Sequence, residues 1–113
     1  MVLPLWPQWR WGAALPSAPE HLSDAATAVW AEIGAAFAAC GDDISRVSGP
    51  DLDAYVGQVA RLRDAQARVD REGLVVADAK GQPIPHPALA LERDAQKEIR
   101  AWGDTFRPRR RGR

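Results

Sequence analysis

The sequence predicts a mainly α-helical protein: a three-helix core with a long central helix, a short β-hairpin-like connection, an extended N-terminal arm and a basic C-terminal tail. Two observations predict this class. Apolar residues recur every three or four positions in three stretches, which is the period of an amphipathic helix. Glycine follows each stretch, as is typical where a helix ends. The chain is accordingly divided into an arm at 1–19, a helical domain at 20–106 and an arginine-rich tail at 107–113.

The predicted arm combines aromatic residues with prolines. It holds three of the five tryptophans, Trp6, Trp9 and Trp11, together with four prolines. Proline lacks a backbone N–H and fixes φ, which disfavours a continuous helix or a central strand. Tryptophan side chains are too apolar to remain in water without cost, so we expect them either to dock on a neighbouring subunit or partner or to cover the domain's own core.

The first helix is expected to begin after Ser23, whose hydroxyl can accept a hydrogen bond from the first turn, and to end at Gly41. Its predicted apolar face consists of Val29, Trp30, Ile33, Ala36 and Phe37. Cys40 is the only cysteine and has no histidine nearby in the sequence. We therefore interpret it as a small, at least half-buried residue rather than a catalytic thiol, and as a sign of a reducing compartment.

The longest helix is expected from Leu52 to Glu72. Ser48 and Asp51 are predicted to cap its start, with Pro50 inside the first turn, and Gly73 to end it. Apolar residues form a heptad-like seam, interrupted only by Gln66 and widened by Val56 and Ala65, at the positions Leu52, Tyr55, Val59, Leu62 and Val69. Candidates for an oligomer or partner interface are Tyr55, Val59 and Leu62, together with the tryptophans of the arm.

A short strand at 74–77, a turn at 78–81 and a return segment at 82–85 follow this helix. Because Pro83 and Pro85 lack N–H groups, the segment is predicted to be either a minimal edge hairpin or an irregular loop. The third helix is expected to begin at His86, with Pro87 at its first position and His86 in a structural role. Its predicted apolar stripe is Leu91, Ala95, Ile99 and Trp102.

The sequence has no motif for catalysis or for cofactor binding. It lacks a glycine-rich phosphate loop, a paired metal-ligand spacing and a nucleophile motif. We therefore expect no enzyme activity, no catalytic residue, no cofactor and no metal. No run of 18 apolar residues is present and the N-terminus lacks the basic start of a signal peptide, so we expect a soluble intracellular protein without membrane contact.

Charge is distributed unevenly along a chain whose formal net charge is +0. Residues 107–113 contain five of the 15 basic residues, which leaves 10 basic against 15 acidic residues in the rest of the chain. A basic tail on a mildly acidic body permits contact with nucleic acid through the tail. The candidate DNA-binding residues are Arg107, Arg109, Arg110, Arg111 and Arg113.

The order of these motifs resembles a known family. The motifs are Ala18-Pro19-Glu20-His21-Leu22-Ser23, Val29-Trp30, the helix start at 51–55, Glu72-Gly73-Leu74-Val75-Val76, His86-Pro87-Ala88-Leu89, and a last helix followed by glycine and arginines. Together they resemble the phage terminase small subunits of the short, all-helical type found in tailed phages and prophages, over residues 18 to about 111.

This resemblance implies a non-catalytic viral DNA-packaging component in the cytoplasm of the bacterial host cell. Such a component would bind double-stranded phage DNA, assemble as a homo-oligomeric ring, and recruit or regulate the large terminase subunit, which carries ATPase and nuclease activities. The alternative is a small helical adaptor that binds a protein partner and no DNA. A helix-turn-helix regulator is less favoured, because the connection at 42–49 is longer than the usual turn of that motif.

Overall fold

The computed structural model describes residues 18–109. The three arm tryptophans and Arg110, Arg111 and Arg113 lie outside the described residues. The described chain forms α2 (Asp24–Ala39), the 3₁₀ turn η1 (Ile44–Arg46), α3 (Pro50–Glu72), β1 (Val75–Ala77), β2 (Pro83–Pro85) and α4 (Ala88–Trp102). The prediction of a mainly helical fold with three helices and a hairpin-like connection is confirmed.

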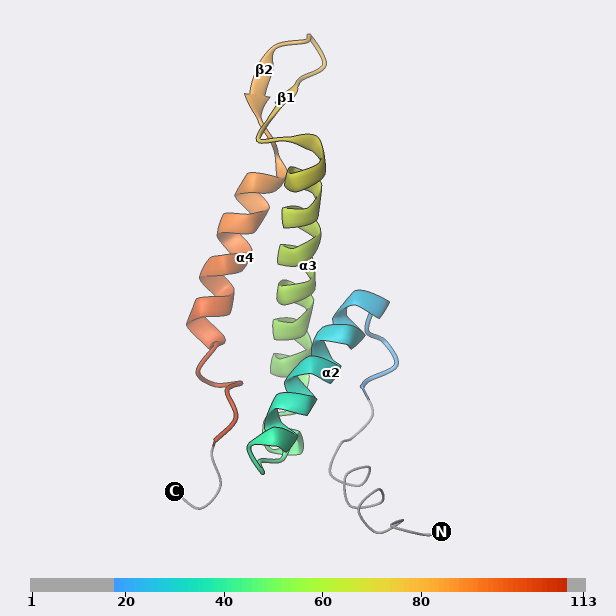
Figure 1. Ribbon diagram of the computed structural model, residues 1–113, viewed down its shortest axis with the longest axis vertical. Coiled ribbons are helices and arrows are strands. Elements are labelled where there is room, and N and C mark those ends of the chain that lie inside the picture. The colour runs from blue at the N-terminus through green and yellow to red at the C-terminus, as the bar shows by residue number, and fades with distance from the viewer. Residues whose placement is uncertain (1–17, 110–113) are drawn as a thin grey trace.

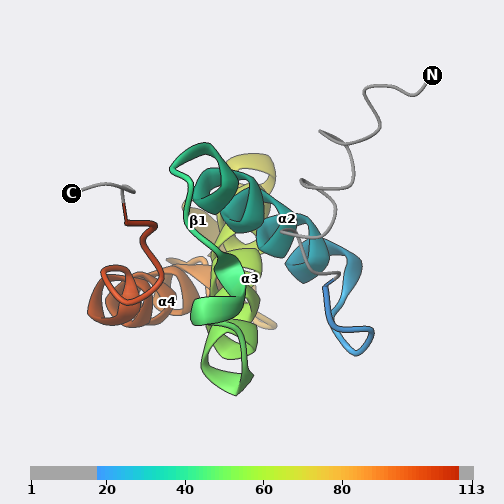
Figure 2. The same cartoon turned by 90° about the horizontal axis from the view of Figure 1, so that it is seen from below.

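Helix α3 is the spine of the molecule (Figure 1). Its 23 residues span about 35 Å at 1.5 Å per residue. The β1–β2 hairpin lies at one end of α3, and α4 returns alongside it, while α2 crosses the other half of α3 (Figure 1). Seen along the spine, α2 and α4 lie on different sides of α3 (Figure 2). In the described part of the chain, both helices therefore pack chiefly on α3 rather than on one another.

Both ends of α2 follow from local sequence. The Ser23 hydroxyl accepts a hydrogen bond from the Ala26 N–H at 3.1 Å. At the other end Gly41 adopts a φ of +73°, its N–H donates to the Ala38 carbonyl at 3.0 Å, and the Asp42 N–H donates to the Phe37 carbonyl at 2.9 Å. This pair of bonds is a Schellman motif, and it turns the chain toward η1.

The predicted apolar face of α2 is wrong at one residue. Ala36 is exposed, whereas Val29, Trp30 and Phe37 are buried and Ile33 is half-buried. Because α3 covers only one side of α2, the buried stripe is narrower than the predicted face.

The predicted Ser48 cap of α3 is also wrong. Gly49 is the N-cap residue, with a φ of +142° and no side-chain capping bond, and the helix begins at Pro50 rather than Leu52. Ser48 instead donates its hydroxyl hydrogen to the Ser45 carbonyl at 3.2 Å. The positive φ of Gly49 turns the chain abruptly before the helix, so Ser48 belongs to the preceding turn. Pro50 at the first helical position is as predicted.

The face of α3 that packs inside the molecule differs from the predicted seam. Its buried positions are Leu52, Val56, Ala60, Ala65 and Val69. The spacing is mostly four residues rather than alternately three and four, because α2 and α4 contact different sides of the spine. Gln66 is exposed, while Tyr55, Val59 and Leu62 are half-buried. Ala60 is the buried position that the heptad reading omits.

The core is unequally distributed along α3. The larger cluster lies where α2 crosses, and its fully buried side chains are Phe37, Ile44, Leu52 and Val56. The smaller cluster, near the hairpin, contains only Ala65, Val69 and Ala88, with Leu89 packed against it. Alanine contributes little apolar area, so the hairpin half is the less well stabilised part of the described structure.

The connection between α3 and α4 is a minimal hairpin, which is one of the two predicted alternatives. Strands β1 and β2 are antiparallel, with Val76 opposite Ile84. Pro83 and Pro85 are exposed at the two flanking positions. Their missing N–H groups therefore do not interrupt the pairing of Ile84.

His86 joins the end of α3 to the start of α4. Its ring is buried, Nε2 lies 2.7 Å from Glu72 Oε1, and Nδ1 accepts a hydrogen bond from the Ala88 N–H at 2.9 Å. The Ala88 bond assigns the ring proton to Nε2, from which it is donated to Glu72. This bond lowers the pKa of Glu72. The expected structural role at the helix start is confirmed, although Pro87 is the N-cap and α4 begins one residue later.

The predicted apolar stripe of α4 is wrong at two positions. Ala95 is buried and Ile99 half-buried, but Leu91 is 63% exposed and Trp102 is 43% exposed. Helix α4 presents the small residues Ala88 and Ala95 to α3, so the larger side chain of Leu91 stays outside the contact. Within residues 18–109 no helix is long and apolar enough to cross a membrane.

Candidate nucleic-acid interface and assembly surface

The segment that follows α4 is held in the core by Phe106. This residue is only 5% exposed and belongs to the larger hydrophobic cluster. Its ring centroid lies 4.8 Å from that of Tyr55 and 6.3 Å from that of Trp102. Phe106 was not among the predicted core or site residues, because it follows the glycine that ends the helix. The signal that could have found it is an apolar aromatic residue between Asp104 and the arginines.

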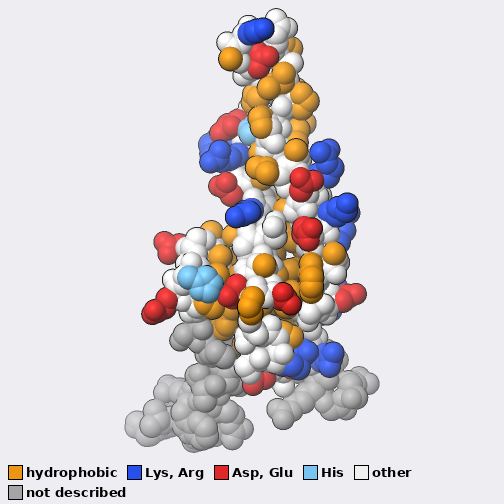
Figure 3. Space-filling view, turned by 180° about the vertical axis from the view of Figure 1, so that it is seen from behind, with side chains coloured by type: hydrophobic (Ala, Val, Ile, Leu, Met, Phe, Trp, Pro, Cys, Tyr) orange, Lys and Arg blue, Asp and Glu red, His pale blue; other side chains and the backbone are white. Residues whose placement is uncertain are grey.

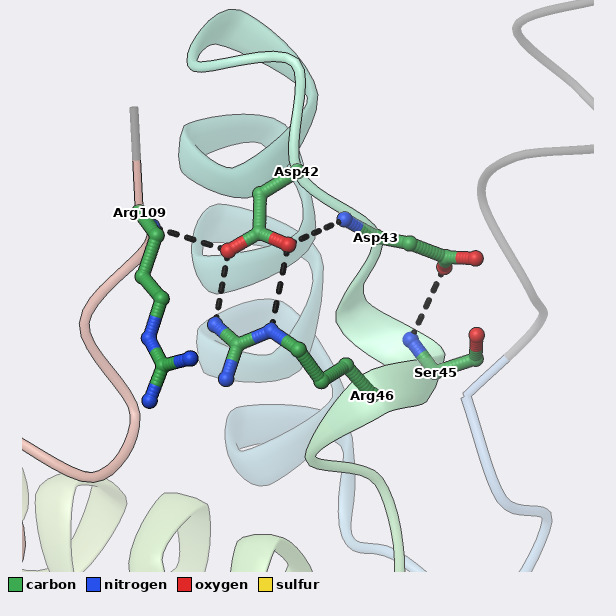
Figure 4. A network of polar contacts seen from close by, with 5 residues as sticks. All are labelled: Asp42, Asp43, Ser45, Arg46 and Arg109. Atoms are coloured by element: carbon green, nitrogen blue, oxygen red, sulfur yellow. Dashed lines mark hydrogen bonds and ion pairs between the residues drawn. The ribbon is translucent and has the colours of Figure 1, made fainter. Parts of the chain in front are cut away.

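Asp42 provides a second attachment for the same segment (Figure 4). One carboxylate oxygen accepts hydrogen bonds from Arg46 Nη2 at 2.6 Å and from the Arg109 backbone N–H at 2.8 Å. The other accepts from Arg46 Nε at 3.2 Å and from the Asp43 N–H at 2.8 Å. Four donors therefore converge on a carboxylate whose side chain is 12% exposed. The tail is thereby joined to the turn that follows α2.

The charge on Asp42 is stabilised by these donors. The Arg46 guanidinium, followed by the Arg109 backbone N–H, holds the pKa of the Asp42 carboxyl well below its usual range. Arg46 is itself held in place, since its guanidinium carbon lies 5.6 Å from the centroid of the Phe37 ring. These hydrogen bonds therefore favour the ionised form of the Asp42 carboxyl.

The structure brings only two of the predicted DNA-binding residues into view. Arg107 is exposed, and its guanidinium lies 3.1 Å from the carboxylate of Asp104. Arg109 is also exposed; its backbone is held by Asp42, and no carboxylate within residues 18–109 pairs with its guanidinium. Since Arg46 and Arg107 each face an acid here, the excess positive charge begins at Arg109 and continues into the three arginines beyond the described part.

A groove between the three helices is the second candidate surface. Its volume is about 1010 Å³, and small side chains that include Ala60, Ala65 and Ala95 line it. Leu91 stands at its wall with most of its surface exposed. Figure 3 shows apolar side chains along the spine between charged ones, from the hairpin toward the foot of the molecule. No group of three or more potential metal ligands occurs within the described residues.

The predicted interface residues of α3 have mixed positions. Tyr55 and Val59 are half-buried and pack against the larger cluster, so part of each side chain serves the fold of the single chain. Leu62 is half-buried as well. Sequence analysis missed the exposed apolar residues of the hairpin, Leu74 at 64% and Val75 at 62%. A sequence pattern that predicts a strand does not indicate whether another part of the protein covers its apolar side chains.

Comparison with known proteins identifies the family. A family model described as phage terminase, small subunit, matches residues 26–111, which extends from α2 into the arginine tail. No curated protein and no solved structure gives a significant match. The family match covers well over half of the chain and confirms the resemblance inferred from the motifs. The chain therefore belongs to the phage terminase small subunit family.

Proposed function

We propose that this protein is the DNA-recognising, non-catalytic component of a phage DNA-packaging complex. In this proposal it binds double-stranded phage DNA, assembles as a homo-oligomeric ring, and recruits or regulates a large subunit with ATPase and nuclease activities in the cytoplasm of the host. The observation that carries the packaging role is the family match over residues 26–111. The charges and exposed apolar surfaces of the described residues support the finer assignments.

The arginine tail supports direct contact with DNA. Each phosphate that a basic side chain neutralises lowers log K by about 0.9 per unit of log salt concentration. The five tail arginines therefore set an upper bound of about 4.5 for that slope in each protomer. Contacts of this kind position a protein on DNA without reading its sequence. Assembly into a ring would multiply a weak contact of each protomer by avidity.

A matched set of arginine variants tests the DNA contact. Changing Arg110, Arg111 and Arg113 to Gln should weaken binding to a double-stranded DNA fragment and lower the salt slope by about 2.7 per protomer. The control replaces Arg93 and Arg100, which are exposed on α4, by Gln as well. It should change the affinity and the salt slope less than the tail variant does. Fluorescence anisotropy at several salt concentrations measures both quantities. Unchanged affinity and slope in the tail variant would refute the DNA contact.

The hairpin half of α3 and α4 supports assembly. Its core is the small alanine-rich cluster, and Leu74, Val75 and Leu91 are each more than half exposed. Exposed apolar surface of this kind is typical of a site of protein–protein contact. We propose that this surface takes part in assembly together with the predicted residues Tyr55, Val59 and Leu62 and the tryptophans of the arm.

Native mass tests the assembly. Light scattering at micromolar protein should give a homo-oligomer well above dimer size. Leu91→Gln should lower that mass, whereas Ala101→Gln, at an exposed position later in α4, should not. A monodisperse monomer for the unmodified chain would refute assembly. Retention of a protein partner with no DNA binding at low salt would instead favour the adaptor alternative, for which the groove is the natural docking surface.

A further inference from the structure

We propose that Asp42 positions the C-terminal tail, so that the tail arginines approach phosphates from one fixed point on the domain. The inference rests on the proposed contact between the tail and DNA and adds a residue that itself touches no DNA. Asp42 is a positioning residue in this scheme: it acts through the Arg109 backbone and through Arg46.

The geometry distinguishes Asp42 from its neighbour. Asp42 accepts a hydrogen bond from a residue 67 positions away and a bidentate pair of bonds from Arg46. Asp43 accepts only a local bond, from the Ser45 N–H at 2.9 Å. The two acids are adjacent and carry the same charge, but only the first reaches the tail. Comparing the two substitutions therefore separates the effect of losing the attachment of the tail from the effect of losing a negative charge.

Two attachments hold the described end of the chain. Phe106 is held in the core, and Arg109 is held by Asp42, so the chain between them is fixed at both ends. Without Asp42, Phe106 is the last attachment among the described residues, and the Arg109 backbone loses its fixed place on the domain. Binding DNA through this segment must then also order the backbone at 107–109. Ordering a single residue costs about 1 kcal/mol, which is a factor of about five in affinity.

Charge alone predicts the opposite result. Removing the Asp42 carboxylate removes a negative charge beside the tail and releases the Arg46 guanidinium from its partner. Both changes would strengthen the attraction to DNA. A loss of affinity on removal of this acid therefore has a positional cause.

The first test uses the full chain and a double-stranded DNA fragment. Asp42→Ala should weaken binding by up to about fivefold, because the ordering cost opposes and exceeds the gain from removing an acid beside the tail. Asp43→Ala should bind at least as tightly as the unmodified chain. Far-UV circular dichroism verifies that each variant is folded.

A second pair of variants leaves the carboxylate untouched. Arg109→Pro removes both the side-chain charge and the N–H that Asp42 accepts, whereas Arg109→Gln removes the charge alone. The proline variant should bind about fivefold more weakly than the glutamine variant, because only the proline variant frees the backbone at this position from Asp42.

Two results would overturn the inference in different ways. If the tail variant at Arg110, Arg111 and Arg113 loses affinity but Asp42→Ala binds as tightly as the unmodified chain or more tightly, the positioning role is refuted and the DNA contact stands. If the tail variant binds normally, the DNA contact itself is refuted, and the positioning role is refuted with it.

Discussion

Phe106→Ala should destabilise the protein by about 3 kcal/mol, because it removes the aromatic ring that holds the chain after α4 in the core. Substitution of a buried phenylalanine by alanine costs about 3 to 5 kcal/mol, depending on how far the site can collapse. Phe106 is 5% exposed, but its neighbour Trp102 is 43% exposed and has room to move. That freedom favours the lower end of the range.

Urea unfolding followed by far-UV circular dichroism measures this change. The protomer concentration must be held constant, because assembly contributes to the apparent stability. Phe106→Leu keeps most of the apolar volume and should cost less than about 1.5 kcal/mol. Trp102→Ala removes a larger but more exposed side chain and should cost less than Phe106→Ala. A loss below about 1 kcal/mol for Phe106→Ala would show that Phe106 does not hold the chain in the core.

The remaining predictions concern backbone, cap and charge. Gly49→Ala should destabilise by about 1 to 3 kcal/mol, because its φ of +142° is strained for any residue with a Cβ. Gly57→Ala should stabilise the protein by up to about 1 kcal/mol, because Gly57 lies within α3, where alanine favours the helix, and the added Cβ would contact nothing. Ser23→Ala should cost about 1 kcal/mol through loss of the α2 cap, and urea unfolding measures all three. The bond from His86 lowers the pKa of Glu72 from its ordinary value of 4.5, so the associated stability is present above pH 4.5 and is lost as the pH falls below it. Thermal unfolding should therefore depend less on pH below 4.5 in Glu72→Gln.

Features set by residues within one turn were predictable from the sequence. The Ser23 cap and the end of α2 at Gly41 each depend on a few neighbouring residues and are found as expected. The start of α3 shows the limit of this reasoning. Ser48 and Gly49 both stand where a cap could form, and the choice between them depends on a backbone angle that composition does not reveal.

Features set by packing between helices were less predictable. A helical period identifies an apolar face but not which part of it a neighbour covers, so Leu91 and Ala36 were wrongly placed in contacts. The same limit explains why Ala60 was missed on α3. The tail attachment is the extreme case, because Asp42 and Arg109 are 67 residues apart and neither has a local signal for the other. The run of arginines could be read from the sequence, whereas its attachment to Asp42 could be found only in the folded structure.

The hairpin part of the proposed assembly surface is separated along the spine from the attachment of the tail, whereas Tyr55 of that surface lies beside Phe106. The hairpin, with its exposed Leu74 and Val75, lies at one end of α3, and the attachment of the tail lies near the other (Figure 1). Since α3 is about 35 Å long, copies that associate through the hairpin half need not cover the tails. A closed ring would then present one tail per protomer on the same side of the assembly, because rotational symmetry repeats every attachment point at the same height. In such a ring the Arg109 backbones held by Asp42 would lie on one circle, which gives the proposed DNA contact a defined place on the assembly.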